Sequence, residues 1–293
     1  MRKFILGTDW WSDCDDAVAV RLLTRYAREG KIELLGVGIN ATMEYSAPSL
    51  RAFLDLDGMH DVPIGIDRDA TDFIGVAKYQ KRLAESLKTP MTNDDFPDAA
   101  RLYRRLLAEA AGKVEIIEIG FLQVLRDLLK TEPDELSDLN GTELVRQKVA
   151  RVWSMAGKWD KDGECEHNFS NNERSCLAGY ELLETCPVPI TFLGFEVGLH
   201  VITGGRVDKN DHLGVLMRDH GSEGGRHSWD PMLTLLAIIG DPVEAGYREV
   251  RGRASLSKET GANYFIPDDG GLHSYVIKER ENKFYEDMID SIL

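Results

Sequence analysis

Short apolar runs alternate with amphipathic segments along most of the chain. The apolar runs predict buried strands over residues 3–6, 32–37, 62–66, 114–119, 149–155 and 190–193. Apolar positions three and four apart predict helices over residues 17–28, 47–56, 99–111, 122–129, 173–184 and 230–239. Strands that alternate with helices form β-α-β units with right-handed crossovers. We therefore expect an α/β fold in which helices flank a mainly parallel central sheet.

Nothing in this pattern marks a domain boundary. The chain has no dividing proline- or glycine-rich linker, no internal repeat and no low-complexity tract. Residues 67–98 are irregular and charged, which is typical of a long surface loop or insertion. Residues 275–293 are charged and amphipathic, which predicts a packing helix. We expect a single domain over residues 1–293.

The charge balance and the cysteines narrow the class of protein. The formal net charge is −15, which disfavours nucleic acids and anionic membranes as partners because their phosphates attract cations. No segment approaches the ~20 apolar residues of a membrane span, and the first apolar run is too short for a signal peptide. The four cysteines have neither CxxC spacing nor the density of a secreted scaffold. We expect a cytoplasmic protein with reduced thiols.

Four aspartates fall within eight residues at the end of the first predicted strand: Asp9, Asp13, Asp15 and Asp16. In parallel sheets, ligands bind outside the carboxyl ends of the strands. Capping of the following helix accounts for one or two acidic residues, but not for four. Clustered carboxylates suit a hard cation such as Ca²⁺, which takes about 6–8 oxygen ligands.

Two common ligand-binding loops do not match this stretch. An EF-hand calcium loop has a different spacing and a glycine at its sixth position. A phosphate-binding loop is rich in glycine and ends in lysine, whereas here Trp10 and Trp11 occupy the turn.

The stretch Thr8–Ala19, TDWWSDCDDAVA, resembles the opening motif of the nucleoside hydrolase family, the inosine–uridine-preferring type. Further segments resemble later motifs of that family in the same order. They are GVGIN at 36–40, GFLQVL at 120–125, SMAG at 154–157, EHNF at 166–169, GFEV at 194–197 and WDP at 229–231. The resemblance covers about residues 3–242, and the order of the short motifs carries it.

This resemblance implies a Ca²⁺-dependent hydrolase that converts a ribonucleoside and water into ribose and base. It implies a metal-activated water and an oxocarbenium-like transition state, as in glycoside hydrolysis. It also implies a small-molecule substrate and a homodimer or homotetramer. The implied metal ligands are Asp9, which is also the general base, Asp16, the carbonyl of Gln123, and Asp230. The implied sugar-binding residues are Asp15, Asn40, Glu166 and Asn168.

The first turn is one residue longer than the usual family motif. We align the motif on Asp15, Asp16 and Ala17, because the helical pattern follows them. Counting forward from Asp9 would instead put Asp13 at the ribose position and Cys14 at a metal position. A thiolate is a poor ligand for Ca²⁺, so we prefer the first alignment and expect Asp13 to line the pocket. A substrate-contact role for Cys14 stays open.

The residue that would protonate the departing base also differs from the family pattern. Trp229 stands where many members have a histidine that protonates the departing base, and tryptophan cannot act as that acid. His227 is the nearest histidine that can take this role. Otherwise Trp229, Trp10 or Trp11 would stack on the base, although both N-terminal tryptophans also suit a core.

Two further residues complete the sequence-based picture of the site. Asp160 falls where the family often has an asparagine near the 5′ end of the sugar. His167 lies between two predicted sugar ligands, and we expect it to point away from them.

Two other functions remain open from the sequence. One is a nucleoside- or pentose-binding protein that has kept the pocket and lost catalysis. The other is a hydrolase of a different ribosyl compound.

Overall fold

The computed structural model describes residues 1–73 and 75–293. Ten strands form one sheet, and its parallel part runs in the order β3-β2-β1-β4-β5-β7-β12. These strands are β1 (Arg2–Thr8), β2 (Ile32–Ile39), β3 (Ile64–Ile66), β4 (Val114–Glu118), β5 (Val149–Met155), β7 (Ile190–Leu193) and β12 (His273–Lys278). The expected α/β class with a mainly parallel sheet is confirmed.

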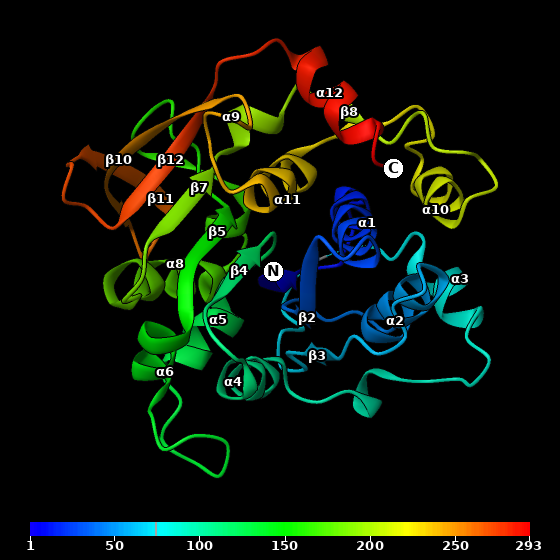
Figure 1. Cartoon of the computed structure of the whole chain (residues 1–293), viewed down its shortest axis with the longest axis horizontal. Helices are drawn as coiled ribbons and strands as arrows, with labels where there is room; N and C mark the ends of the chain where they lie inside the picture. Colours follow the sequence, from blue (N-terminus) through cyan, green and yellow to red (C-terminus); the bar gives the residue numbers. More distant parts are fainter. Residues whose placement is uncertain (74) are drawn as a thin grey trace.

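Helices cover both faces of this sheet (Figure 1). One face packs against α1 (Asp15–Arg28), α2 (Ser46–Leu56) and α11 (Trp229–Ile239), with α12 (Asn282–Asp290) beside α11. The other face packs against α4 (Ala99–Glu109), α5 (Gln123–Leu129), α6 (Gly141–Lys148) and α8 (Glu173–Thr185). The two apolar clusters formed in this way are the core, and each strand and helix predicted from the apolar pattern matches an observed element of its type.

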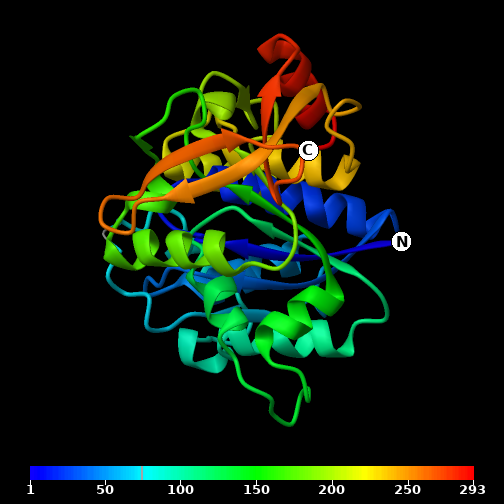
Figure 2. The same cartoon turned by 90° about the vertical axis from the view of Figure 1, so that its left-hand side faces the viewer.

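The sheet continues beyond the parallel part through antiparallel strands. Strand β10 (Tyr247–Leu256) pairs with β12 and with β11 (Ala262–Pro267), and β11 pairs with the short β6 (Glu164–Cys165). Figure 2 shows β10 and β11 in orange, in the upper part of the molecule. The C-terminal half of β10 alternates buried and exposed residues, and its exposed positions Arg248, Arg251 and Arg253 hide the strand from a search for apolar runs.

Two segments differ from the sequence-based expectation. Residues 275–293 are not one packing helix, because they begin within β12 and only then form α12. The strand forms there because β7 and β10 offer backbone partners on either side. Within 67–98, where we expected an irregular loop, the chain forms α3 (Gln80–Glu85) and a 3₁₀ turn, Asn93–Asp95.

The remaining short elements surround the carboxyl ends of the parallel strands. They are α7 (His167–Ser170), α9 (Phe195–Gly198), β8 (Ile202–Thr203), α10 (His212–His220) and β9 (Arg226–His227). Strands β8 and β9 pair as a separate antiparallel ribbon, and α10 lies in the chain between them. None of the helices described is long and apolar enough to cross a bilayer.

Candidate functional site

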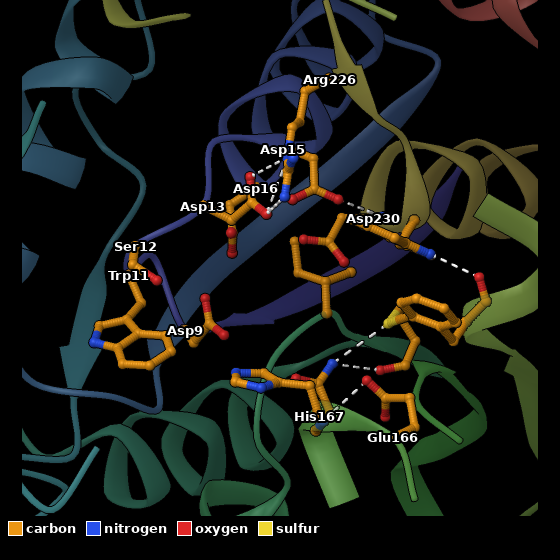
Figure 3. A pocket seen from close by; sticks show the side chains of 15 residues that line it. Asp9, Trp11, Ser12, Asp13, Asp15, Asp16, Glu166, His167, Arg226 and Asp230 are labelled. Atoms are coloured by element: carbon orange, nitrogen blue, oxygen red, sulfur yellow. Dashed lines mark hydrogen bonds and ion pairs between the residues drawn. The ribbon is translucent and has the colours of Figure 1, made fainter. Parts of the chain in front are cut away.

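A cavity of about 260 Å³ opens at the carboxyl ends of β1, β4 and β5 (Figure 3). Its wall comes mainly from three segments far apart in sequence: the turn after β1, the start of α7, and the segment from β9 into α11. The lining residues are Asp9, Trp11, Ser12, Asp13, Asp15, Asp16, Ile119, Met155, Glu166, His167, Asn168, Phe195, Arg226, Trp229 and Asp230.

Three buried carboxylates meet in this cavity. One oxygen from each of Asp15, Asp16 and Asp230 lies within 4.8 Å of the other two. The first two open α1 and the third opens α11, and the main-chain N–H of Asp230 donates to Asp15 Oδ2 over 3.3 Å. Asp16 accepts hydrogen bonds from the Thr8 hydroxyl and from the Trp10 N–H. None of the three carboxylates forms an ion pair within residues 1–73 and 75–293.

Burial and mutual repulsion make the charged form of these three carboxylates unfavourable unless a cation binds to them. Burial, followed by the charge of neighbouring aspartates, raises the pKa of Asp15 and of Asp230 well above the ordinary value. Burial raises the pKa of Asp16 to about 6, although the Thr8 hydrogen bond lowers it. Buried anions without a partner are costly. A hard divalent cation would remove that cost, and carboxylate oxygens are the ligands it prefers.

Asp9 lines the same cavity but is not part of the three-carboxylate group. It follows β1 directly and is 9% exposed. Burial first, and then the charge of Asp16 and Asp15, raise its pKa well above the ordinary value for an aspartate. A carboxylate whose pKa is raised in this way is a stronger base, as a proton acceptor needs.

Glu166 and Asn168 face the cavity from the start of α7. The Glu166 carboxylate accepts hydrogen bonds from the N–H groups of Gly157 (2.9 Å) and Asn168 (3.0 Å). The Asn168 amide donates to the Met155 carbonyl over 2.8 Å. Burial raises the pKa of Glu166 to about 7. Both side chains are held in place and supply the donors and acceptors that sugar hydroxyls need.

The two N-terminal tryptophans have different environments. Trp11 lines the cavity, and its ring stacks on His167 with centroids 5.7 Å apart. His167 therefore faces the cavity, and the expectation that it points away was wrong. Trp10 is fully buried in the core, and its indole N–H donates to Ser49 Oγ over 2.8 Å. Trp10 cannot stack on a ligand, so its proposed stacking role is corrected.

Trp229 lines the cavity, but its ring is already engaged. Phe195 stacks on it with centroids 5.3 Å apart, and the indole N–H donates to the Phe195 carbonyl over 2.7 Å. The guanidinium of Arg226 lies over the same ring, 5.7 Å from its centroid. His227 packs on Trp229 and is not among the lining residues. The structure therefore does not bring His227 to the place of a leaving-group acid.

Arg226 is a charged cavity residue that the sequence reasoning missed. Its Nε and Nη2 donate to the two carboxylate oxygens of Asp13, at 2.8 and 2.5 Å. Burial alone would raise the pKa of Asp13, but the hydrogen bonds and charge of Arg226 lower it below its usual value. Asp13 lines the pocket as expected. No sequence pattern joins these two residues, which lie 213 positions apart.

Cys14 is buried directly before α1 and does not line the cavity. Its thiol lies near Asp13 and His220, a combination that can in principle hold a metal. However, Asp13 already pairs with Arg226, and burial raises the pKa of the thiol, which opposes formation of the thiolate ligand. Helix α1 begins at Asp15, in agreement with the preferred alignment of the motif.

Three predicted site residues besides Trp10 and His227 lie outside the cavity wall. Asn40 is fully buried, and its Oδ1 accepts from the Phe121 N–H. Gln123 is also fully buried, and its amide donates to the Asn40 carbonyl. These two side chains join the ends of β2 and β4. Asp160 is exposed and paired with Lys158 over 2.7 Å, so its expected contact with the sugar is corrected.

Comparison with solved structures gives matches over nearly the whole chain. A plant nucleoside hydrolase, PpNRh1, has a TM-score of 0.72 and 16% identity, covering 99% of this chain and 98% of that one. An inosine–uridine-preferring nucleoside hydrolase from Bacillus anthracis has a TM-score of 0.71 and 15% identity, with all of both chains covered. The type III effector XopQ, solved with adenosine diphosphate ribose, has a TM-score of 0.71 and 14% identity, covering 99% and 93%.

Comparison by sequence alone finds no similar protein. No protein-family model and no curated protein matches this chain. The structural matches show that the chain has the nucleoside hydrolase fold, as the order of the short motifs predicts.

Proposed function

We propose that this protein is a divergent nucleoside hydrolase that uses a divalent cation, Ca²⁺, to split the N-glycosidic bond of a ribonucleoside. The observation that carries the proposal is the group of three buried, unpaired carboxylates in the cavity of this fold. These three carboxylates meet in one cavity of a chain that is only 14–16% identical in sequence to the structures compared.

The carboxylates of Asp15, Asp16 and Asp230 would hold the cation. When bound, Ca²⁺ would supply positive charge that makes a water more acidic and orients two ribose hydroxyls. Asp9 and the main-chain carbonyl of Gln123 are the other ligands that the family motifs imply. Of these two residues, only Asp9 is among those that line the cavity.

The remaining chemistry belongs to the side chains. Asp9, a cavity carboxylate outside the three-carboxylate group, accepts the proton of the attacking water. Glu166 and Asn168 hold sugar hydroxyls through side chains that main-chain contacts keep in position. The carboxylates around the sugar favour the cationic, oxocarbenium-like transition state over the neutral substrate. Trp11 offers an aromatic surface to the base.

The experiment that tests this function measures the release of reducing sugar from a panel of purine and pyrimidine nucleosides. Each assay is run with Ca²⁺ and again with a chelator. Release that the chelator abolishes and added Ca²⁺ restores supports the proposal. A folded protein that binds Ca²⁺ and hydrolyses none of the nucleosides contradicts it.

A second candidate is recognition of another ribosyl compound, with or without its hydrolysis. It is favoured by the effector of the same fold that was solved with adenosine diphosphate ribose, and by Trp229 at the position of the usual histidine. Calorimetric titration with ribose and with adenosine diphosphate ribose tests it. Tight binding of either compound without turnover of nucleosides would favour this candidate.

A further inference from the structure

The cavity has a buried floor and an open mouth with different chemistry. The three-carboxylate group forms the floor, where each residue is at most 5% exposed. Arg226 stands at the mouth with its side chain 32% exposed, and the exposed His167 lies on the opposite side (Figure 3). A sugar held at the floor directs the group attached to it towards this mouth.

Breaking the N-glycosidic bond leaves its electron pair on the departing nitrogen. The resulting negative charge needs a proton or a hydrogen-bond donor at that place. Neither tryptophan of the cavity wall can supply the donor. The Trp229 N–H already donates to Phe195, and the Trp11 Nε1 atom is buried away from the cavity space.

Arg226 meets the requirements of such a donor. Its Nε and Nη2 are fixed by Asp13, and its plane rests over Trp229, so the side chain is oriented before any substrate binds. Within residues 1–73 and 75–293, Nη1 forms no hydrogen bond, which leaves its two N–H groups for a ligand. A guanidinium keeps its charge at all working pH values, so it can stabilise an anion but not release a proton to it.

We propose that Arg226, oriented by Asp13, is the catalytic residue that stabilises the departing base as an anion, in place of an acid that protonates it. This inference rests on the proposed function. The bond between the anomeric carbon and nitrogen breaks, and its electron pair goes to the base. Water adds to the carbon and gives one proton to Asp9. The base leaves as an anion bound by Arg226 and then takes a proton from solvent. Asp9 releases to solvent the proton that it accepted from the water. Asp13 is a positioning residue.

The test compares two leaving groups in the wild type and in Arg226→Gln. Inosine has a poor leaving group, whereas the phenolate of p-nitrophenyl β-D-ribofuranoside departs as a stable anion without help. Removal of one donor to a developing anion typically costs about 10²–10³ in kcat. We expect a loss of this size on inosine and a loss of less than about tenfold on the nitrophenyl riboside. Asp13→Asn, which frees Arg226, should show the same pattern with a smaller loss.

The controls separate this inference from the proposed function and from misfolding. Arg253→Gln breaks an exposed arginine–aspartate pair outside the cavity and should change neither rate. His167→Phe should lower both rates by a similar factor if His167 only packs against Trp11.

An equal loss on both substrates in Arg226→Gln, with the wild-type melting temperature retained, would overturn the role of Arg226. So would a leaving-group-dependent loss in His167→Phe alone. A wild type inactive on both substrates would overturn the proposed function itself.

Discussion

The main-chain N–H of Asp230 donates to the carboxylate of Asp15 over 3.3 Å and joins the first turns of α11 and α1, although the two residues are 215 positions apart. Both helices therefore begin at the same point in the cavity, with acidic side chains in their first turns. Carboxylates at helix N-termini are stabilised by the helix dipole. Two helix dipoles and the hydrogen bonds from Asp230, Thr8 and Trp10 hold this acidic group in place, but they do not neutralise it.

Replacement of these carboxylates by amides should abolish the response to Ca²⁺. We expect Asp16→Asn and Asp230→Asn to lose the rise in melting temperature that Ca²⁺ gives the wild type, and to lose activity. Without Ca²⁺ both variants should be at least as stable as the wild type, because each removes a buried charge. Asp160→Asn is the control, since Asp160 is exposed and outside the cavity. Thermal unfolding with Ca²⁺ and with a chelator measures all of these effects. A full Ca²⁺ response in Asp230→Asn would rule out this cation site.

Asp9→Asn should separate catalysis from binding of the cation. The variant removes the proton acceptor, so kcat should fall by about 10²–10⁴, the usual contribution of general base catalysis. The three-carboxylate group remains, so the variant should still be stabilised by Ca²⁺. Steady-state kinetics and calcium titration are the two measurements. If kcat stays within a few-fold of the wild type, Asp9 is not the base.

The two adjacent tryptophans should respond differently to replacement by phenylalanine. Trp10→Phe loses a buried hydrogen bond to Ser49, whose hydroxyl still donates to the Ser46 carbonyl. The loss should cost about 0.5–1.5 kcal/mol of unfolding free energy. Trp11→Phe removes an N–H that has no partner among residues 1–73 and 75–293, so its cost in stability should be smaller. It reduces the surface offered to the base, so KM should rise. Chemical denaturation and kinetics of the two variants test this. A larger KM change for Trp10→Phe would contradict the placement of Trp10 in the core.

Glu118 should make the stability of the fold depend on pH, independently of the cavity. This carboxyl is fully buried beneath the sheet, close to the Tyr103 hydroxyl, and burial raises its pKa from 4.5 to about 8. The folded protein then holds a proton that the unfolded chain releases, so this group lowers stability progressively between pH 4.5 and about pH 8. Glu118→Gln should remove that loss.

The test for Glu118 is unfolding of both proteins across this pH range. Glu118→Gln should match the wild type near pH 5 and be more stable at pH 8 and above. Parallel pH profiles of stability for the two proteins would show that Glu118 is ionised throughout.

The sequence predicted the parts of the site that depend on local position. Asp9 follows an apolar run at the end of a strand, and the fold brings such ends to one edge of the sheet. Glu166 and Asn168 were predicted from the family resemblance, and they line the same cavity. Asn40 and Gln123 also lie at such ends, but their side chains turn into the interior and bond to the backbone. Position along a strand or helix is readable from sequence, whereas the direction of a side chain in a turn depends on what packs against it.

Local patterns in the sequence are enough to predict the class of fold and the place of the N-terminal acidic cluster. Apolar periodicity depends on neighbours a few residues away, and the carboxylates are adjacent in the chain. Long-range packing determines which tryptophan faces the cavity, keeps His227 outside it, and pairs Arg226 with Asp13 at its mouth. The physical reason is distance along the chain. A contact between residues more than two hundred positions apart depends on the packing of α10 and α11 against α1, which no local sequence pattern predicts.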